Sequence, residues 1–256
     1  MFTRFLICGD SFSEGMSDEI VNGNYRGWAD RVADVMARGN PGFTYANFSI
    51  RGKLVHQVIK DQIPLALKFV TGPETLISFH AGANDVLRPN YKPDLVLPHY
   101  AQAVRQIAAS DATVMLFTVL ERTDSQGKSA DVWAARFGEF NANVRRIGNE
   151  VGAIVVDANE EGFLADRRFL ASDRLHLNAM GHDRVTQGVL EKLSLACSSD
   201  WRSPLPPAQP KKWLLKLKED LRWFFTFLLP WIIRRIRGKS SGDGRRAKQS
   251  RPIPWP

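Results

Sequence analysis

The sequence predicts an α/β fold in which a parallel β-sheet is covered by helices on both faces. Short apolar runs alternate along the chain with longer segments whose apolar residues recur at helical spacing. Strands and helices that alternate in this way form parallel sheets, because each crossover helix packs on a face of the sheet. The length of 256 residues and a hydrophobic content of 44% suit one medium-sized globular domain with an appendage.

The expected elements follow one another as strand and helix from the N-terminus. Strands are expected where apolar residues form short runs, at 5–8, 43–48, 74–79, 113–120 and 153–157. Helices are expected where apolar residues recur every three to four positions, at 27–38, 54–69, 94–109, 131–150 and 178–195. Gly39 should end the first helix, Pro64 should kink or break the second, and Asp131 is the expected N-cap of the fourth.

Charge is divided unevenly along the chain. Residues 201–256 contain 14 Lys and Arg but three Asp and Glu, a net charge of +11, whereas residues 1–200 carry a net charge of −3. This asymmetry points to an anionic partner for the C-terminal part. The two cysteines are too few for a disulfide framework, and no signal peptide is evident, so we expect a cytoplasmic protein.

The same division sets the expected domain boundaries. Residues 1–200 form the predicted globular domain, and residues 201–212 form a linker in which four prolines favour an extended spacer. Residues 213–237 are a predicted basic amphipathic helix, which Pro230 should kink or stop. Residues 238–256 are rich in Gly, Ser, Arg and Pro and are predicted to be disordered.

A candidate nucleophile follows the first predicted strand. Residues 9–15 read GDSFSEG, so Ser11 lies just past a strand end, where parallel sheets bind their ligands. Acyl transfer needs a nucleophile, a base and a group that orients the base. The segment DRLH supplies the last two, because Asp173 and His176 are three residues apart and can meet within one turn. The alternatives are that Ser11 is a turn or capping residue, that Asp173 is a helix cap or a surface charge, and that His176 is a structural loop residue.

Donors for a developing oxyanion are expected beside this nucleophile. Asn84 in GAND can supply a side-chain amide, Gly52 a backbone N–H that no side chain obstructs, and Ser11 its own N–H. All three follow predicted strands and therefore converge on one edge of the sheet. Turn chemistry is the alternative for Asn84 and Asp85, and Gly52 alone is a weak signal. No spacing of Cys, His and Asp resembles a metal site.

Together these segments resemble the SGNH hydrolases, the broader GDSL esterase and lipase family. That family is named after Ser, Gly, Asn and His in four blocks, which here are Ser11, Gly52, Asn84 and His176, in agreement over about residues 1–197. The resemblance implies a flavodoxin-like three-layer α/β/α fold with a five-stranded parallel sheet. It also implies no metal and no organic cofactor.

The resemblance assigns roles to the same residues. It implies a catalytic triad of Ser11, His176 and Asp173, and an oxyanion hole of Ser11, Gly52 and Asn84. Asp10 and Asp85 are expected to support the loops of the site. Phe12 stands where the family name has Leu, at a position that is not catalytic.

The predicted function is the hydrolysis of carboxylic esters through an acyl-enzyme on Ser11. A non-catalytic, membrane-associated binding or assembly module on the same fold is the alternative. For residues 213–237, the two main hypotheses are binding to an anionic membrane surface and packing on a protein partner. Their many apolar residues disfavour nucleic-acid binding. The expected location is the cytoplasm, with peripheral attachment to the inner face of the membrane as an option.

Overall fold

The central sheet has six strands in the order β7-β6-β5-β1-β4-β8. The computed structural model describes residues 1–121, 127–160, 162–210 and 212–256, so residue 211 of the predicted linker lies outside the described residues. Five strands are parallel, namely β1 (Arg4–Gly9), β4 (Thr44–Asn47), β5 (Thr75–His80), β6 (Thr113–Phe117) and β7 (Ile154–Val156). A small hairpin of β2 (Ile20–Val21) and β3 (Asn24–Tyr25) is separate from this sheet.

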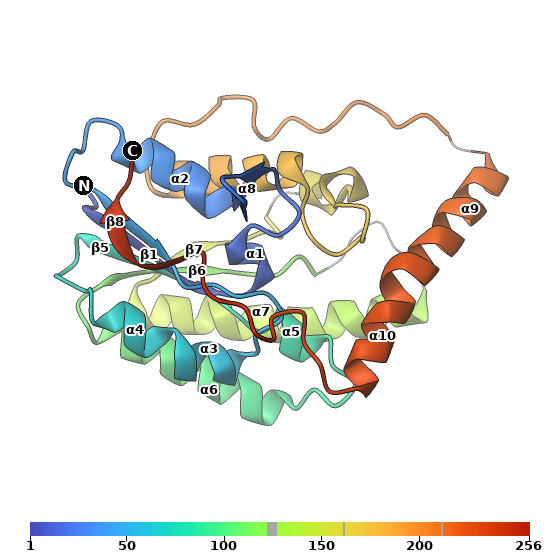
Figure 1. The fold of residues 1–256 in the computed structure, drawn as a ribbon, viewed down its shortest axis with the longest axis horizontal. Coiled ribbons are helices and arrows are strands. Elements are labelled where there is room, and N and C mark those ends of the chain that lie inside the picture. The colour runs from blue at the N-terminus through green and yellow to red at the C-terminus, as the bar shows by residue number, and fades with distance from the viewer. Residues whose placement is uncertain (122–126, 161, 211) are drawn as a thin grey trace.

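Helices cover both faces of the sheet (Figure 1). One face carries α2 (Gly27–Ala37) and α8 (Ala179–Lys192), which contact each other. The other face carries α3 (Val55–Asp61), α4 (Ile63–Leu67), α5 (Ala83–Val86), α6 (Pro93–Ala108) and α7 (Lys128–Val151). The short elements are α1 (Ser11–Glu14) and the 3₁₀ turns η1 (Gly162–Ala165) and η2 (Arg167–Phe169). The predicted α/β class with a three-layer arrangement is confirmed.

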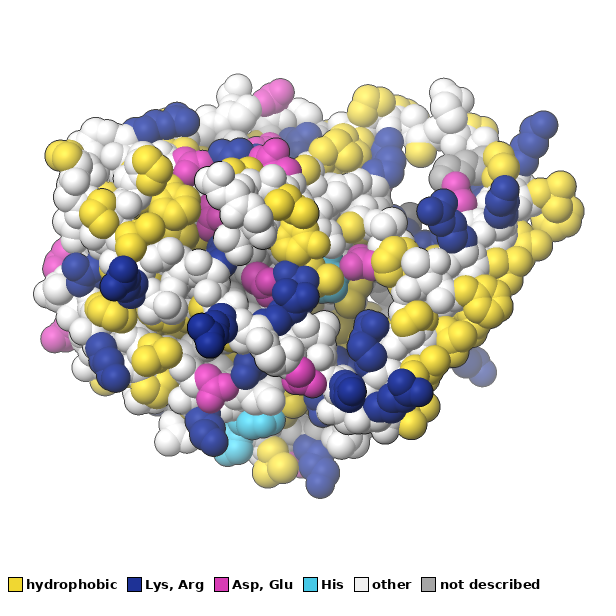
Figure 2. All heavy atoms as spheres, viewed as in Figure 1, with side chains coloured by type: hydrophobic (Ala, Val, Ile, Leu, Met, Phe, Trp, Pro, Cys, Tyr) yellow, Lys and Arg dark blue, Asp and Glu magenta, His cyan; other side chains and the backbone are white. Residues whose placement is uncertain are grey.

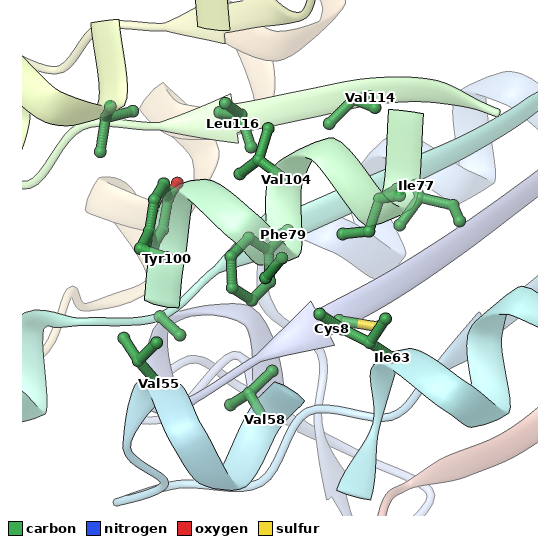
Figure 3. Packing of buried hydrophobic residues seen from close by; sticks show 14 of the residues in the cluster. Cys8, Val55, Val58, Ile63, Ile77, Phe79, Tyr100, Val104, Val114 and Leu116 are labelled. Atoms are coloured by element: carbon green, nitrogen blue, oxygen red, sulfur yellow. The ribbon is translucent and has the colours of Figure 1, made fainter. Parts of the chain in front are cut away.

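Buried side chains alternate between two apolar clusters, one on each face. Phe5 and Ile7 of β1 join the cluster under α2 and α8, whereas Leu6 and Cys8 join the cluster under α3 to α7. Successive strand residues point to opposite faces, and here both faces are covered, so the whole strand reads as an apolar run. Figure 3 shows the second cluster, with Cys8 among aliphatic and aromatic side chains. This burial raises the pKa of the Cys8 thiol.

Two local predictions about helix boundaries have different outcomes. The break at Pro64 is confirmed, because α3 ends at Asp61 and Pro64 lies in the first turn of α4. The prediction that Asp131 is an N-cap is wrong, because α7 already begins after Gly127. The backbone N–H of Asp131 donates to the carbonyl of Gly127, which places Asp131 inside the first turn.

The C-terminal helix continues through Pro230. Helix α9 (Trp213–Trp223) passes through a π-helical turn, η3 (Phe224–Leu228), directly into α10 (Leu229–Ile236). The helix does not stop at Pro230, which lies in the first turn of α10. Instead, the helix changes to the π-helical turn η3 just before α10. No helix in the described part of the chain combines the length and the apolar character that a membrane crossing requires.

The prediction that residues 238–256 are disordered is wrong for residues 249–254, which form the strand β8 (Gln249–Pro254). This strand pairs antiparallel with β4 and extends the five predicted parallel strands by one. Proline lacks an N–H donor, but an edge strand tolerates it because one side of the strand has no partner. Trp255 follows and packs on Tyr45 with ring centroids 4.6 Å apart. Lys248 precedes β8 and its ammonium lies 2.8 Å from the Asp30 carboxylate, with both side chains largely buried.

Candidate active site

The structure brings Ser11, His176 and Asp173 together at the carboxyl edge of the sheet. Ser11 is the first residue of α1, immediately beyond β1 and Asp10. His176 Nε2 lies 3.0 Å from Ser11 Oγ, and His176 Nδ1 lies 2.7 Å from Asp173 Oδ2. These distances are short enough for a continuous hydrogen-bonded chain from carboxylate through imidazole to hydroxyl.

The loop before α8 holds Asp173 and His176 in one turn. The backbone N–H of Ala171 donates to the His176 carbonyl at 2.8 Å, which closes the loop. Asp173 Oδ1 accepts the backbone N–H groups of Leu175 and His176, each at 3.0 Å. Partial burial alone would raise the pKa of Asp173, but the hydrogen bonds from the His176 ring and from this backbone keep the pKa below its ordinary value. The carboxylate is therefore an anion that faces the imidazole.

Asp10 orders the turn that presents Ser11. Its side chain is buried, and its Oδ1 accepts the backbone N–H of Phe12 at 3.1 Å, which caps α1. Its Oδ2 accepts the Asn84 amide at 3.1 Å, so the first and third blocks are in direct contact. Phe12 packs between aromatic rings and is closest to His80, with ring centroids 4.5 Å apart. A Cβ on Gly9 would lie 2.5 Å from the His80 carbonyl, so the strand end requires glycine.

The predicted oxyanion donors are all near Ser11, but they are not equally free. Gly52 has a φ of 74°, which favours glycine, and among the described residues neither its N–H nor that of Ser11 has an acceptor. Asn84 Nδ2, in contrast, donates to both Asp10 Oδ2 and the Lys53 carbonyl, the latter at 3.2 Å. Both amide hydrogens of Asn84 are thus engaged within the protein.

Asp85 lies beside the site and does not contact the triad. Its carboxylate accepts the backbone N–H of Val55 at 2.9 Å, so it satisfies a donor at the start of α3. Burial raises the pKa of Asp85 to about 6, despite that hydrogen bond. Asp85 thus ties the GAND turn to the start of α3.

Two further contacts position the nucleophile and were not predicted. Glu14 in α1 forms an ion pair with Arg51 and accepts the Arg51 backbone N–H at 2.6 Å. This pair ties the nucleophile turn to the residue before Gly52. Buried Gln62 donates to the Gly9 carbonyl at 2.9 Å and accepts the Gly9 N–H at 2.8 Å. In the sequence, the opposite charges of Glu14 and Arg51 were the signal that could have predicted the contact between them.

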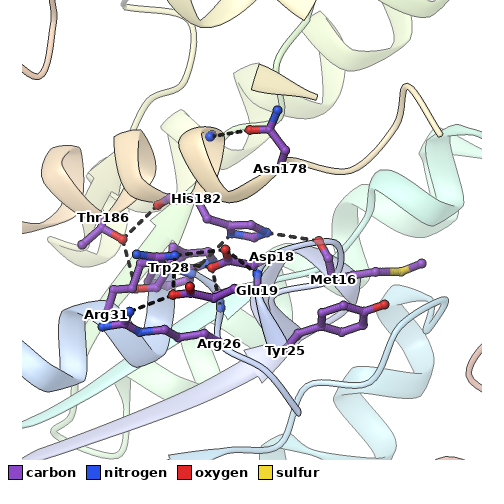
Figure 4. A network of polar contacts seen from close by, with 12 residues as sticks. Met16, Asp18, Glu19, Tyr25, Arg26, Trp28, Arg31, Asn178, His182 and Thr186 are labelled. Atoms are coloured by element: carbon purple, nitrogen blue, oxygen red, sulfur yellow. Dashed lines mark hydrogen bonds and ion pairs between the residues drawn. The ribbon is translucent and has the colours of Figure 1, made fainter. Parts of the chain in front are cut away.

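A second histidine network joins α2, α8 and the loop after α1 (Figure 4). His182 is buried; its Nε2 lies 3.1 Å from the Met16 carbonyl and its Nδ1 accepts the Trp28 N–H at 3.3 Å. Burial lowers the pKa of His182 to about 4, so the ring is neutral at physiological pH. His182 therefore joins the loop after α1 to the start of α2, which is a structural role.

The C-terminal segment reaches the edge of the site at two points. Trp223 Nε1 donates to the backbone carbonyl of Asp173 at 2.8 Å. The chain between α10 and β8 passes over Gly52, where Ser240 Oγ donates to the Gly52 carbonyl at 3.3 Å. A Cβ on Gly52 would collide with Ser240 Oγ. Neither contact could be read from the sequence.

Comparisons with known proteins identify a family and similar folds. Residues 7–184 match the GDSL-like lipase/acylhydrolase family. A variant of the acetyl xylan esterase Axe2 from Geobacillus stearothermophilus has a similar fold, with a TM-score of 0.60 and 19% identity over 76% of this chain and 96% of that one. The psychrotrophic esterase EstA from Pseudoalteromonas sp. aligns with a TM-score of 0.55 and 17% identity over 75% and 97%. At such identities the likeness concerns the fold. No curated protein matches the sequence.

Proposed function

The chain belongs to the GDSL-like lipase/acylhydrolase family, and on that basis we propose that it is a serine hydrolase of carboxylic esters with Ser11 as its nucleophile. The observation that carries the proposal is the hydrogen-bonded chain from Asp173 through His176 to Ser11. A nucleophile, a base and a group that orients the base are the parts that acyl transfer requires.

In the first half of the reaction, Ser11 Oγ attacks the acyl carbon while His176 Nε2 takes its proton. Asp173 holds the other ring nitrogen and stabilises the imidazolium that forms. The tetrahedral intermediate collapses when His176 gives the proton to the departing alkoxide, which leaves as an alcohol. Water then attacks the acyl-enzyme, His176 accepts its proton, and the acid is released as the proton returns to Ser11 Oγ.

The oxyanion is stabilised by the N–H groups of Ser11 and Gly52 and by the Asn84 amide. The two backbone donors have no acceptor among the described residues, which supports their assignment. Asn84 would share one of its engaged hydrogens with the oxyanion, because its amide already donates to Asp10 and Lys53. Asn84 then has two functions, since it also couples the GAND turn to the nucleophile turn.

The test is hydrolysis of a series of acyl esters, from short to long chains, by the wild type and by Ser11→Ala. Loss of the attacking hydroxyl should lower kcat by about 10³-fold or more with the fold intact. Unchanged turnover in the variant would reject the assignment. The non-catalytic binding or assembly module would gain support if no ester were turned over above the variant's background.

The location of the protein is a second part of the proposal. We predict a cytoplasmic protein that can attach peripherally to the inner face of the membrane. The basic segment at residues 213–237, with six Lys and Arg against two acidic residues, supports this prediction. Fractionation of cells that express the full chain would check this prediction. We expect the protein in both the cytosolic and the membrane fractions.

A further inference from the structure

The helix that runs from α9 through η3 to α10 leaves a row of large apolar side chains exposed. Figure 2 shows hydrophobic side chains along its outer edge at the right of the molecule, with Lys and Arg beside them. Phe225 is 62% exposed and Ile236 is 81% exposed. Further members of this outer row are Leu214, Leu217 and Leu221, each about half exposed. An exposed apolar row of this length marks an interaction surface.

The inner side of the same helix is fixed to the catalytic loop. Trp223 donates its indole N–H to the Asp173 carbonyl, and Asp220 forms an ion pair with Arg174 at 2.7 Å. The Arg174 guanidinium also lies 5.0 Å from the centre of the Trp223 ring. These contacts hold the helix so that its outer row points away from the domain, and the row cannot turn in against the domain without breaking them.

The helical segment that carries the row is mostly positive in charge. Residues 213–237 contain six Lys and Arg, and one of the two acidic residues, Asp220, is already paired with Arg174. Near the end of the helix, Arg235 lies close to Arg234 and to Arg88 of the domain, and burial together with these like charges lowers the pKa of Arg235. Positive charges that are brought together in this way favour an anionic partner.

Charge also distinguishes between the two candidate occupants of the row. A symmetric contact with a second copy of the chain, helix against helix, would bring two basic segments together, so like charges would meet across the contact. An anionic bilayer instead offers hydrocarbon for the apolar row and phosphate groups for the flanking Lys and Arg. Because no described helix can cross a membrane, this contact would lie in the plane of the surface.

We propose that the outer face of the helix formed by α9, η3 and α10 docks in the plane of an anionic lipid bilayer. The docked helix is joined to the loop of Asp173, so it holds the candidate active site beside the membrane surface. The docking itself does not depend on the ester chemistry, and the two proposals can fail separately.

The test uses the full chain with Ser11→Ala, so that lipid cleavage cannot alter the vesicles. Binding is measured by co-sedimentation with vesicles of phosphatidylcholine alone or with added phosphatidylglycerol. We expect at least tenfold tighter binding to the anionic vesicles, and weaker binding as salt is raised. Absence of binding to anionic vesicles, or equal binding to both kinds, would overturn the proposal.

A matched pair of variants tests the face itself. Leu217→Glu changes a row residue that is 48% exposed, and Leu65→Glu changes an α4 residue that is 42% exposed and lies away from the helix. Leu217→Glu should weaken binding to anionic vesicles at least tenfold, and Leu65→Glu should leave it unchanged. Equal binding by the two variants would overturn the proposal. Phe225→Glu provides a second row variant should Leu217→Glu fail to fold, as judged by circular dichroism.

Light scattering of the same proteins tests the competing occupant. The proposal predicts a monomer in solution, with or without the Glu substitution. A dimer that Leu217→Glu dissociates would assign the row to a second copy and overturn the membrane assignment. Leu217→Glu in the protein that retains Ser11 should turn over a soluble short ester as fast as the unmodified chain, because Leu217 is 48% exposed and lies in the outer row. Vesicle binding without any ester turnover would leave this inference standing and remove the proposed function alone.

Discussion

The domain of residues 4–195 and the C-terminal segment of residues 213–256 are held in place by different forces. The domain keeps its elements together through two buried apolar clusters, one on each face of the sheet. Among the described residues of the C-terminal segment, Trp255 alone packs on a cluster. The contacts that anchor the segment include polar ones, such as Trp223 with Asp173 and Lys248 with Asp30. Apolar burial therefore builds the domain, and a few directional contacts decide where the segment lies.

Loss of the contact between Lys248 and Asp30 should lower the free energy of unfolding more than any other change proposed here. Lys248→Met leaves the buried Asp30 carboxylate without its cation, and breaking a buried pair costs about 3–5 kcal/mol. Burial already raises the pKa of Asp30 even with Lys248 beside it, which shows how unfavourable the unpaired charge would be. Urea unfolding of the two proteins measures the difference.

The control for this prediction is an exposed ion pair in the domain. Arg105 and Glu150 are both nearly half exposed, so Arg105→Met should cost far less stability than Lys248→Met. Similar losses in the two variants would contradict the idea that buried polar anchors hold the segment.

His182 should make the domain sensitive to acid. Its pKa falls from 6.5 to about 4 on folding, so the unfolded chain binds a proton between these values and the folded chain does not. Stability from this group is therefore complete above about pH 6.5 and is lost as the pH falls towards 4, by up to about 3 kcal/mol. Denaturant unfolding between pH 7 and pH 4 should show a shallower loss for His182→Gln than for the wild type.

Exposed His99 is the matched site for that experiment. His99→Gln should follow the pH dependence of the wild type. Parallel curves for wild type and His182→Gln would mean that His182 does not carry the acid sensitivity.

The smallest expected effect concerns the contact between the segment and the triad. Trp223→Phe removes the donor to the Asp173 carbonyl, and one hydrogen bond of about 1 kcal/mol corresponds to roughly a fivefold change in rate. We expect kcat to fall by about that factor with KM unchanged, because Asp173 is displaced and the substrate contacts are not. Steady-state kinetics on a soluble ester measure both constants.

Trp231→Phe is the corresponding change on α10, at a Trp that stacks under Arg235, 5.2 Å from the ring centre. It should leave kcat as in the wild type. Equal losses in the two Trp variants would show that the helix influences the site in general and not through Asp173.

The same contrast explains how far the sequence could predict this molecule. The strands of the domain are apolar runs, so their pattern predicts that Ser11, Gly52 and Asn84 meet at one edge of the sheet. The role of His176 was predicted from the DRLH spacing and the family resemblance, and the 3.0 Å contact between its ring and Ser11 is a tertiary feature that periodicity does not contain. β8 is polar and contains two prolines, and its partner β4 lies some two hundred residues earlier, so no local pattern predicts it. The commitment of the Asn84 amide to Asp10 depends on tertiary distances that spacing does not contain.

The central claim is that Ser11 is an activated nucleophile. The most direct measurement is reaction of the folded full chain with a serine-reactive fluorophosphonate, followed by mass spectrometry of its peptides. We expect a single adduct on the peptide that contains Ser11 and no adduct on the Ser11→Ala protein. An unmodified Ser11, or equal labelling of the Ser11→Ala protein at another residue, would contradict it.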